Sequence, residues 1–465
     1  MKKIDDEIQL LLKEHNGNIR EILEENSRLD YLYALSEQRE LLLEWYDFDP
    51  EGELLQIGAD YGAMTGLFRT SVAQVTVLDE DANALRTVEL RYPGAANIRY
   101  ENGSLFDLKE ERAERFDYVV FAGTLQAPYE EQLQAAKALL KPDGVLIVAV
   151  PNALGMKYFS GTADEANAMT KVQLAQLLPG GRFYYPMPDY RTPVSIYSDQ
   201  YLPKKGDMTR VTPAYDYPRY HMMDMGQKFD TACEAGLFDL YANSYLVFWS
   251  SSSERLENGE DPIYVKYNKT RREVFQIKTC ICEAKKEGGR RRYVEKAALS
   301  LAGSAHIDSF RKKEEELMQQ HRVLKVASPE YRPDRNSAFF PYLEGQTWAE
   351  KLGQQISGGQ LPLEALSQAL DQVYDIRPEF RSSFVRTEEF DEVFGQGLCE
   401  EELALLGQDT ACRVSNIDAL FENMLLTEDG IYCLDYEWVF LFPVPEHFVK
   451  YRILYYFYEQ YSSVM

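Results

Sequence analysis

The stretch from Glu53 to Gly66, ELLQIGADYGAMTG, constrains the fold of this chain more than any other. Its apolar residues lead into Ile57 and then into glycines at 58, 62 and 66, which predicts a buried strand, a tight turn and a helix. Glycine is needed where a turn requires a positive φ, or where a cofactor approaches the backbone closely. The next predicted strand, VTVLDE, carries Asp79 near its end, where a carboxylate can accept hydrogen bonds from both hydroxyls of a ribose. The first hypothesis is therefore a site for a nucleoside-containing cofactor.

Predicted strands and helices alternate from residue 53 to about residue 150. This alternation indicates an α/β fold with a parallel, doubly wound sheet, whose ligands bind at the carboxyl ends of the strands. Residues 1–48 are helical in pattern, with Ser36 as an expected N-cap, and we expect them to cover the sheet edge and the cofactor mouth. The segment SSSERLENGEDP at 251–262 has the composition of a linker. The predicted domains are 1–48, 49–252 with an insertion at about 186–225, and 263–465.

The charge balance excludes one large class of partner. A formal net charge of -25 argues against binding along a nucleic acid, which requires a dense Lys/Arg surface.

No run approaches the roughly eighteen uninterrupted apolar residues of a membrane span, and the N-terminus lacks the apolar core of a signal peptide. The six cysteines have no metal-binding spacing, so we expect reduced thiols in a cytoplasmic protein.

Glycine-rich turns occur in several nucleotide-binding folds, so the order of the later motifs must decide between them. A dinucleotide fingerprint would place glycines at 58, 60 and 63, whereas this chain has Asp60 and Ala63. Asp79 lies seventeen residues beyond Gly62 and is followed by NGSLFDL, FDYVVFAG and LLKPDGVLIVAVPN. In this order the motifs resemble the class I S-adenosylmethionine-dependent methyltransferases over residues 36 to 250. An NAD-dependent enzyme is the alternative for this half of the chain.

The resemblance implies a cofactor site along the carboxyl ends of the strands. The loop from Ile57 to Gly62 would face the methionine end of the cofactor and Asp79 the ribose. Gly103 to Leu105 would face the adenine region, and Ala122 would lie beneath the sulfonium. The residues that the resemblance assigns to S-adenosylmethionine are Gln56, Ile57, Gly58, Ala59, Tyr61, Gly62, Asp79, Gly103, Ser104, Leu105 and Ala122.

The chain departs from the family pattern at three positions in or beside this site. Gln56 stands where the family usually has an acid, although its amide can still hydrogen-bond the cofactor's amino or carboxyl groups. Asp60 replaces a usual glycine and adds a charge near the loop, and Ser104 occupies a place often held by aspartate. Because of these departures, the alternative is a domain that has the methyltransferase fold but no longer transfers methyl groups.

Methyl transfer to a hydroxyl requires a base, in addition to orientation and the exclusion of water. The sequence offers His221, Asp189 and Tyr190 in the insertion, and Tyr158 after the VPN strand. None has a diagnostic spacing, and a lone histidine is more often structural. We therefore treat His221 as a candidate base only.

The second half of the chain has another spacing that points to chemistry. Asp418 is followed five residues later by Asn423 in NIDALFENMLL, and Asp435 lies twelve residues further on in CLDYEW. Kinases use this spacing to place a catalytic base and two magnesium ligands. Upstream, Lys296 lies in the predicted strand YVEKAAL. Glu314 shares the apolar face of the helical segment HIDSFRKKEEEL, so we expect it to pair with Lys296.

These residues together resemble the protein-kinase-like superfamily over residues 263 to 460, nearest to its aminoglycoside and lipopolysaccharide-core kinases. The resemblance implies an α+β bilobal domain that binds ATP and Mg. It assigns catalysis to Asp418 and Lys296, nucleotide binding to Glu314, and the metal to Asn423 and Asp435. Asn416 replaces the usual histidine, and no glycine-rich loop precedes Lys296. A non-catalytic nucleotide-binding or scaffold domain is therefore the alternative.

A methyltransferase domain followed by a kinase-like domain resembles the bifunctional enzymes that cap bacterial surface polysaccharide chains. The resemblance implies an acceptor that is a glycan or a lipid-linked glycan, with S-adenosylmethionine, ATP and Mg as cofactors. The competing hypothesis is a methyltransferase whose inactive pseudokinase binds a partner such as a glycosyltransferase. Fold-level resemblance does not fix the acceptor.

Overall fold

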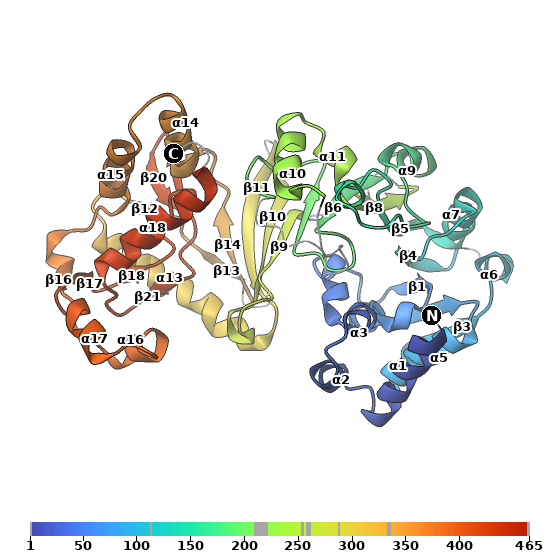
Figure 1. The fold of residues 1–465 in the computed structure, drawn as a ribbon. Helices are drawn as coiled ribbons and strands as arrows, with labels where there is room; N and C mark the ends of the chain where they lie inside the picture. Colours follow the sequence, from blue (N-terminus) through green and yellow to red (C-terminus); the bar gives the residue numbers. More distant parts are fainter. Residues whose placement is uncertain are drawn as a thin grey trace. The chain divides into compact units, whose positions relative to one another are not determined.

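The computed structural model describes residues 2–111, 114–208, 222–252, 255–256, 262–286, 289–332 and 336–462. These residues form two compact units (Figure 1). Unit 1 consists of Met1–Tyr267 and Cys280–Arg291, and unit 2 of Asn268–Thr279 and Arg292–Met465. Most of the linker predicted at 251–262 lies outside the described part of the chain, and so does His221.

Unit 1 is built on the parallel sheet that the alternating pattern predicted. The parallel strands are β1 (Glu53–Ile57), β2 (Gln74–Asp79), β3 (Ile98–Asn102), β4 (Phe116–Ala122) and β5 (Leu140–Pro151). Their order in the sheet is β5-β4-β1-β2-β3. Strand β2 pairs with one edge of β1, and the chain later returns to pair β4 with the opposite edge of β1. The direction of the strand order therefore reverses beside β1. Ligands bind at such a reversal in doubly wound sheets, and the predicted Rossmann-like α/β fold is confirmed here.

Antiparallel strands extend this sheet beyond β5. They are β8 (Ser244–Ser250), β6 (Arg182–Met187), β7 (Ser195–Ser198) and β9 (Pro262–Tyr267), each pairing with the one before it. Of the helices, α4 (Thr65–Ser71), α5 (Ala82–Arg91), α6 (Leu105–Glu111) and α7 (Tyr129–Leu139) connect the parallel strands. The others are α8 (Met156–Phe159), α9 (Lys171–Leu177), α10 (Met225–Glu234) and α11 (Phe238–Tyr241). The apolar run of β5 is buried on both faces, as expected of a central strand.

The N-terminal segment is helical, as its pattern predicted. It forms α1 (Lys2–Glu14), α2 (Ile19–Glu25), α3 (Leu29–Leu35) and the 3-10 helix η1 (Glu37–Leu42). Gln9 of α1 donates hydrogen bonds to Asn83 and Thr87 of α5, which ties the segment to the sheet's covering helices. The Ser36 hydroxyl accepts from the Gln38 amide at 3.2 Å, so the predicted N-cap is confirmed. This cap begins the helix that carries Arg39.

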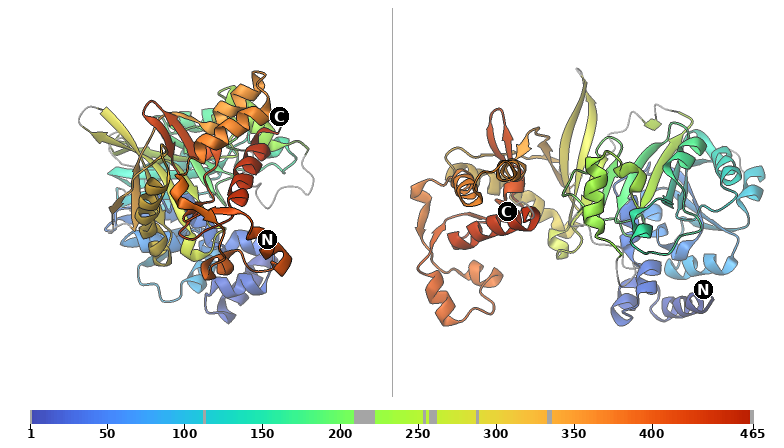
Figure 2. Two further views of the ribbon diagram at one scale, coloured as in Figure 1. Left: turned by 90° about the vertical axis from the view of Figure 1, so that its left-hand side faces the viewer. Right: turned by 45° about the horizontal axis from the view of Figure 1, so that its top comes forward.

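Unit 2 combines small sheets with helices around its own apolar core. Its strands are β11 (Gly289–Ala298, in unit 2 from Arg292), β12 (Lys325–Val326), β13 (Glu330–Arg332), β14 (Ser337–Pro341), β15 (Gln346–Thr347), β16 (Arg381–Ser383), β17 (Thr410–Cys412), β18 (Ser415–Asn416), β19 (Met424–Thr427), β20 (Gly430–Cys433) and β21 (Val439–Phe440). Strands β12, β20, β19 and β15 form one sheet. Its helices are α13 (Ser304–Gln320), α14 (Trp348–Ser357), α15 (Pro362–Val373), α16 (Glu388–Val393), α17 (Glu400–Leu406) and α18 (Glu446–Tyr461). The last of these, α18, is drawn in red (Figure 2). Strand β10 (Ile277–Lys286) contributes residues to both units. Among the described residues, no helix combines the length and apolar character that crossing a membrane requires.

We expect unit 2 to lose stability in mild acid because His321 is buried as a neutral side chain. Burial lowers the pKa of His321 from 6.5 to about 4, and its Nδ1 has no hydrogen-bond partner. Between these values the unfolded chain binds a proton that the folded chain excludes, so stability is lost as pH falls through this window. The full effect is about 3 kcal/mol. Urea unfolding at pH 7 and pH 4.5 should show a smaller loss in His321→Asn than in the wild type. An equal loss in both proteins would contradict this assignment.

Candidate active sites

The loop after β1 turns sharply through the left-handed region of backbone space. Gly58, Asp60, Tyr61 and Gly62 have φ values of 86, 40, 55 and 72°. A Cβ atom at Gly58 would lie 2.5 Å from Cγ2 of Thr124, which follows β4. Only glycine allows this close approach at a positive φ. The loop is therefore held against the strand end at the reversal of the sheet, where the sequence predicted the cofactor.

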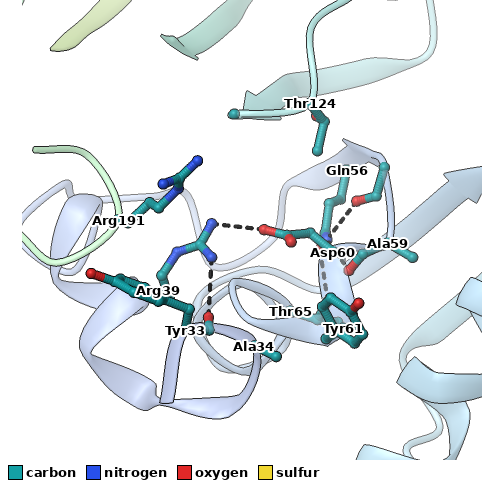
Figure 3. A network of polar contacts seen from close by, with 12 residues as sticks. Tyr33, Ala34, Arg39, Gln56, Ala59, Asp60, Tyr61, Thr65, Thr124 and Arg191 are labelled. Atoms are coloured by element: carbon teal, nitrogen blue, oxygen red, sulfur yellow. Dashed lines mark hydrogen bonds and ion pairs between the residues drawn. The ribbon is translucent and has the colours of Figure 1, made fainter. Parts of the chain in front are cut away.

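Gln56 shapes this loop with its side chain. Its amide nitrogen donates to the carbonyl oxygen of Gly58 at 3.0 Å, and its amide oxygen accepts from the Thr65 hydroxyl at 2.8 Å. The side chain is buried, and Figure 3 shows it behind the loop. Both ends of the amide are thus occupied by the loop and by the start of α4. A contact between Gln56 and a cofactor's amino group stays a prediction, since the amide oxygen of Gln56 can accept one further hydrogen bond.

Asp60 is balanced by a residue that the sequence analysis did not single out. The Arg39 guanidinium reaches Asp60 from η1, with 2.7 Å between Nη2 and Oδ2, and also donates to the Tyr33 carbonyl (Figure 3). Arg39 is 5% exposed and the Asp60 side chain is 30% exposed, so the ion pair is buried on the arginine side only. The charge that distinguishes Asp60 from the family's glycine is therefore neutralised by the N-terminal segment. The pairing spans 21 positions, and no local pattern signals it.

Replacing Arg39 by methionine should lower the free energy of unfolding of unit 1 by about 1–3 kcal/mol, because Asp60 loses its partner. Adding Asp60→Gly should restore stability, since glycine removes the charge and tolerates the φ of 40°. Chemical denaturation of the full chain measures both effects, with Arg86→Met, an exposed arginine on α5, as the matched control. If the double variant is no more stable than Arg39→Met, the Arg39–Asp60 pair does not have this role.

Asp79 links the loop to the ends of the neighbouring strands. One carboxylate oxygen accepts from the Ala59 amide and the other from the Asp81 amide, both at 2.8 Å. The Asp79 carbonyl accepts from the Gly103 amide at 3.1 Å. Each carboxylate oxygen can accept one further hydrogen bond. The structure therefore brings Ala59, Asp79 and Gly103 together, with acceptor capacity remaining for two hydroxyls.

The other predicted cofactor residues lie near the carboxyl ends of β1 and β3. Ser104 caps α6 by accepting from the Phe106 amide at 3.0 Å, which gives this serine a structural role. Tyr61 donates its hydroxyl to Asp5 at 2.6 Å, and burial and this carboxylate raise the pKa of Tyr61. Tyr61 is thus tied to α1. Ile57 lies at the end of β1 and Leu105 at the start of α6, as predicted from their motifs.

The end of β4 is covered by Tyr190. Ala122 is buried, and a Cβ atom on the following Gly123 would lie 2.5 Å from the Tyr190 ring. Asn167 donates to the Gly123 carbonyl at 3.0 Å. Burial raises the pKa of Tyr190 to about 12, so its hydroxyl stays protonated at neutral pH. Of the described candidates for methyl-transfer chemistry, Tyr190 packs directly on the strand end expected beneath the sulfonium.

The remaining candidates belong to a buried charged cluster. Asp189 is fully buried, with one carboxylate oxygen 3.6 Å from Nζ of Lys157. Tyr158 donates to Glu165 at 3.1 Å, and Glu165 also pairs with Lys157 and with Arg191. Burial and then the charge of Glu165 raise the pKa of Tyr158. Asp189 and Tyr158 are therefore engaged in structural contacts.

In unit 2, Lys296 pairs with different carboxylates from the one expected. Its Nζ lies 2.9 Å from Asp435 and 2.5 Å from Glu437, whereas Glu314 accepts a hydrogen bond from Ser328. The Lys296–Glu314 pair is thus not formed. The physical reason is the rotation of α13, which buries Lys313 and leaves Glu314 half-buried at the side. Glu437, which the sequence analysis missed, follows Asp435 by two positions in CLDYEW.

The structure brings Asp418 into the same neighbourhood as Asp435. Burial, and secondarily the charge of Asp435, raise the pKa of Asp418 to about 7. Asn423 donates its amide to the Asp418 carbonyl and Asn416 accepts from the Asp418 amide, both at 2.9 Å. Asn416 therefore positions Asp418 in place of the expected histidine. Arg452 of α18 lies 3.4 Å from the Asp418 carboxylate.

The residues predicted to hold magnesium fit that ion in kind. Asn423 donates through its nitrogen, which leaves its amide oxygen facing away from that bond, and Asp435 supplies a carboxylate. Magnesium usually takes one or two protein oxygens and fills its shell with water and phosphate oxygens. Among the described residues, no group of three or more His, Cys, Asp or Glu side chains is arranged as a metal site. Asn423 and Asp435 would therefore hold the ion only together with a nucleotide.

Comparison with known proteins finds a similarity over part of unit 1. A family model described as a methyltransferase domain matches residues 26–202, which include the loop, Asp79 and Tyr190. The methyltransferase domain predicted from the motif order is therefore supported. A comparison with curated proteins finds no significant match.

Solved structures of methyltransferases are also similar to this chain. One is a phosphoethanolamine N-methyltransferase from Haemonchus contortus in complex with phosphoethanolamine and S-adenosylhomocysteine, with 16% identity, 40% of this chain and 45% of that chain covered, and a TM-score of 0.30. This chain thus spans less than half of that protein. Another is a putative methyltransferase from Bacillus halodurans, with 16% identity, coverage of 45% and 96%, and a TM-score of 0.30. At these TM-scores neither likeness bears on substrate or activity.

Proposed function

We propose that unit 1 transfers a methyl group from S-adenosylmethionine to an acceptor. The proposal is supported above all by one coincidence: the methyltransferase family match covers the same residues that form the loop and Asp79 site. The positive-φ loop lies at the carboxyl end of β1, beside the reversal of the sheet, and Asp79 retains acceptor capacity for ribose hydroxyls. When bound, the cofactor supplies an electrophilic methyl group.

The residues of the chain contribute orientation and a dry environment to this reaction. Asp79 and the loop fix the cofactor at the reversal of the sheet, and Tyr190 closes the end of β4. Because Tyr190 is protonated, it can donate a hydrogen bond to an acceptor oxygen or nitrogen but cannot take its proton. His221 stays a prediction for the base.

Calorimetry tests the cofactor and decides between the two nucleoside hypotheses. The full chain should bind S-adenosylhomocysteine and should not bind NADH under the same conditions. Binding of NADH alone would favour the dehydrogenase alternative and would overturn the methyltransferase proposal.

We propose in addition that unit 2 binds Mg-ATP and transfers its terminal phosphate. The cluster of Lys296, Asp435 and Asp418 supports this, because a cation for phosphate, a metal ligand and a carboxylate base lie in one neighbourhood. The pKa of Asp418, raised to about 7, suits a general base that works near neutral pH. Nucleotide titration against thermal stability tests the proposal, with Asp435→Ala as control. A wild-type protein without a magnesium-dependent shift would leave unit 2 as a scaffold module.

For the acceptor, we propose the end of a bacterial surface glycan or its lipid-linked precursor, modified in the cytoplasm. Only the order of the two domains supports this choice. The alternative is a methyltransferase whose unit 2 is an inactive binding module for a partner such as a glycosyltransferase. Incubation with methyl-labelled cofactor and γ-labelled ATP over a panel of oligosaccharides tests the acceptor. Transfer of both labels to a glycan supports it, and transfer of neither to any glycan contradicts it.

A further inference from the structure

We propose that Glu437 is the residue that positions Lys296 toward a nucleotide phosphate, and that helix α13 does not serve this role. The inference rests on the proposed phosphotransferase function of unit 2. It concerns a residue that acts through Lys296 and does not itself touch the nucleotide. The geometry of one short segment, Asp435 to Glu437, carries it.

Glu437 is a buried carboxylate with both oxygens engaged by cations. It is 3% exposed, with one oxygen 2.5 Å from Nζ of Lys296 and the other 2.5 Å from a guanidinium nitrogen of Arg271. Charge-assisted hydrogen bonds of this kind are shorter and stronger than neutral ones. A carboxylate held from both sides has one available orientation. Glu437 therefore fixes the position of the Lys296 ammonium group.

The backbone at Glu437 is also anchored. Lys313 of α13 donates to the Glu437 carbonyl at 2.6 Å, and the Glu437 amide donates to the Asp435 carboxylate at 3.3 Å. The Arg271 guanidinium lies 5.1 Å from the centre of the neighbouring Trp438 ring. The segment is thus fixed to the helix and to the residues before β10, so the Glu437 side chain starts from a rigid base.

Positioning Lys296 requires a carboxylate, but the charged side chain that helix α13 buries is that of a lysine. Its inward charged residue is Lys313, which is 8% exposed, and Glu314 is bonded to Ser328. A second lysine near Lys296 repels it and cannot orient it. Both partners of Lys296 therefore come from the segment after β20.

This arrangement allows Asp435 and Glu437 to divide two tasks. Asp435 accepts a hydrogen bond from Lys296 at 2.9 Å, and it is also the predicted magnesium ligand. If Asp435 were to bind a metal ion, Glu437 would still hold Lys296. Without Glu437, the lysine would lose its last fixed partner at the moment when a phosphate arrives.

The test compares Glu437→Gln with Glu437→Asp and with the matched control Glu314→Gln, using calorimetry of the full chain with Mg-ATP. We expect Glu437→Gln to weaken binding by about tenfold, since one charge-assisted bond is lost. Glu437→Asp should recover part of the affinity. Glu314→Gln should bind like the wild type. In a Lys296→Met background, Glu437→Gln should have no further effect, because positioning acts only through the lysine.

Three outcomes would overturn the inference while leaving the phosphotransferase function intact. Glu437→Gln could bind Mg-ATP as the wild type does, its effect could persist in the Lys296→Met background, or Glu314→Gln could cause the same loss. The persistent effect would indicate a general structural role. A wild-type protein that binds no nucleotide would instead overturn the phosphotransferase function, and this inference with it. Urea unfolding of each variant shows whether unit 2 is folded, because binding of S-adenosylhomocysteine reports only on unit 1.

Discussion

Replacing Lys296 by methionine should lower the free energy of unfolding of unit 2 by about 1.5–3 kcal/mol. The substitution removes the cation from a site where Asp435 and Glu437 lie 2.9 and 2.5 Å from its nitrogen. Methionine fills a similar volume, so the loss comes from buried negative charge that Arg271 alone then balances, and not from a cavity. Glu437 is 3% exposed and cannot recover its hydration without a local opening of the structure. Urea unfolding of the full chain measures the change.

A second substitution separates charge from packing in this result. Adding Glu437→Gln to Lys296→Met removes the buried carboxylate, and the Arg271 side chain, which is 24% exposed, can be hydrated, so part of the lost stability should return. Lys312→Met is the matched control, because Lys312 is an exposed lysine on α13. A loss of under about 1 kcal/mol for Lys296→Met, within the range of surface pairs, would show that the pair is hydrated.

The parallel sheet of unit 1 could be predicted because its determinants are local. The glycines of the stretch at 53–66, the apolar run of β5 and the position of Asp79 each follow from a few neighbouring residues. The role of Gln56 could not be predicted, since its partner Thr65 is determined by the path of the loop. Arg39 was missed for the same reason. An ion pair between a helix and a distant loop leaves no periodic signal in the sequence.

In unit 2 the motifs singled out Lys296 and Asp435, which the structure brings together. The carboxylate expected to pair with Lys296, that of Glu314, was wrong. Glu314 shares a helical face with Phe310 and Leu317, so periodicity favoured it as the inward residue. The structure buries Lys313 instead. A lysine can bury its long apolar stem and still bring its charge to a carbonyl, as Lys313 does with Glu437. Hydropathy alone does not separate these two positions, which are one residue apart.

The other large effect is expected in unit 1, where Asp79→Ala should weaken binding of S-adenosylhomocysteine by about 100-fold or more. The carboxylate has two connected roles. It holds the loop through the Ala59 amide at 2.8 Å, and its remaining acceptor sites are those proposed for the ribose hydroxyls. Hydrogen bonds to a charged group contribute about 1.5–3 kcal/mol each, and about 1.4 kcal/mol corresponds to tenfold in affinity. Losing the two proposed ribose bonds accounts for the expected factor.

Two controls make the Asp79 result specific. Glu80→Ala removes an exposed acid one residue away and should leave the affinity unchanged, since that side chain is directed to solvent. Asp79→Asn keeps an acceptor oxygen but loses the charge, so its affinity should fall between those of the wild type and Asp79→Ala. Calorimetry of the three variants gives this order directly. If Asp79→Ala binds as tightly as Glu80→Ala, the ribose must be held elsewhere, and the carboxylate serves only to fasten the loop to the end of β2.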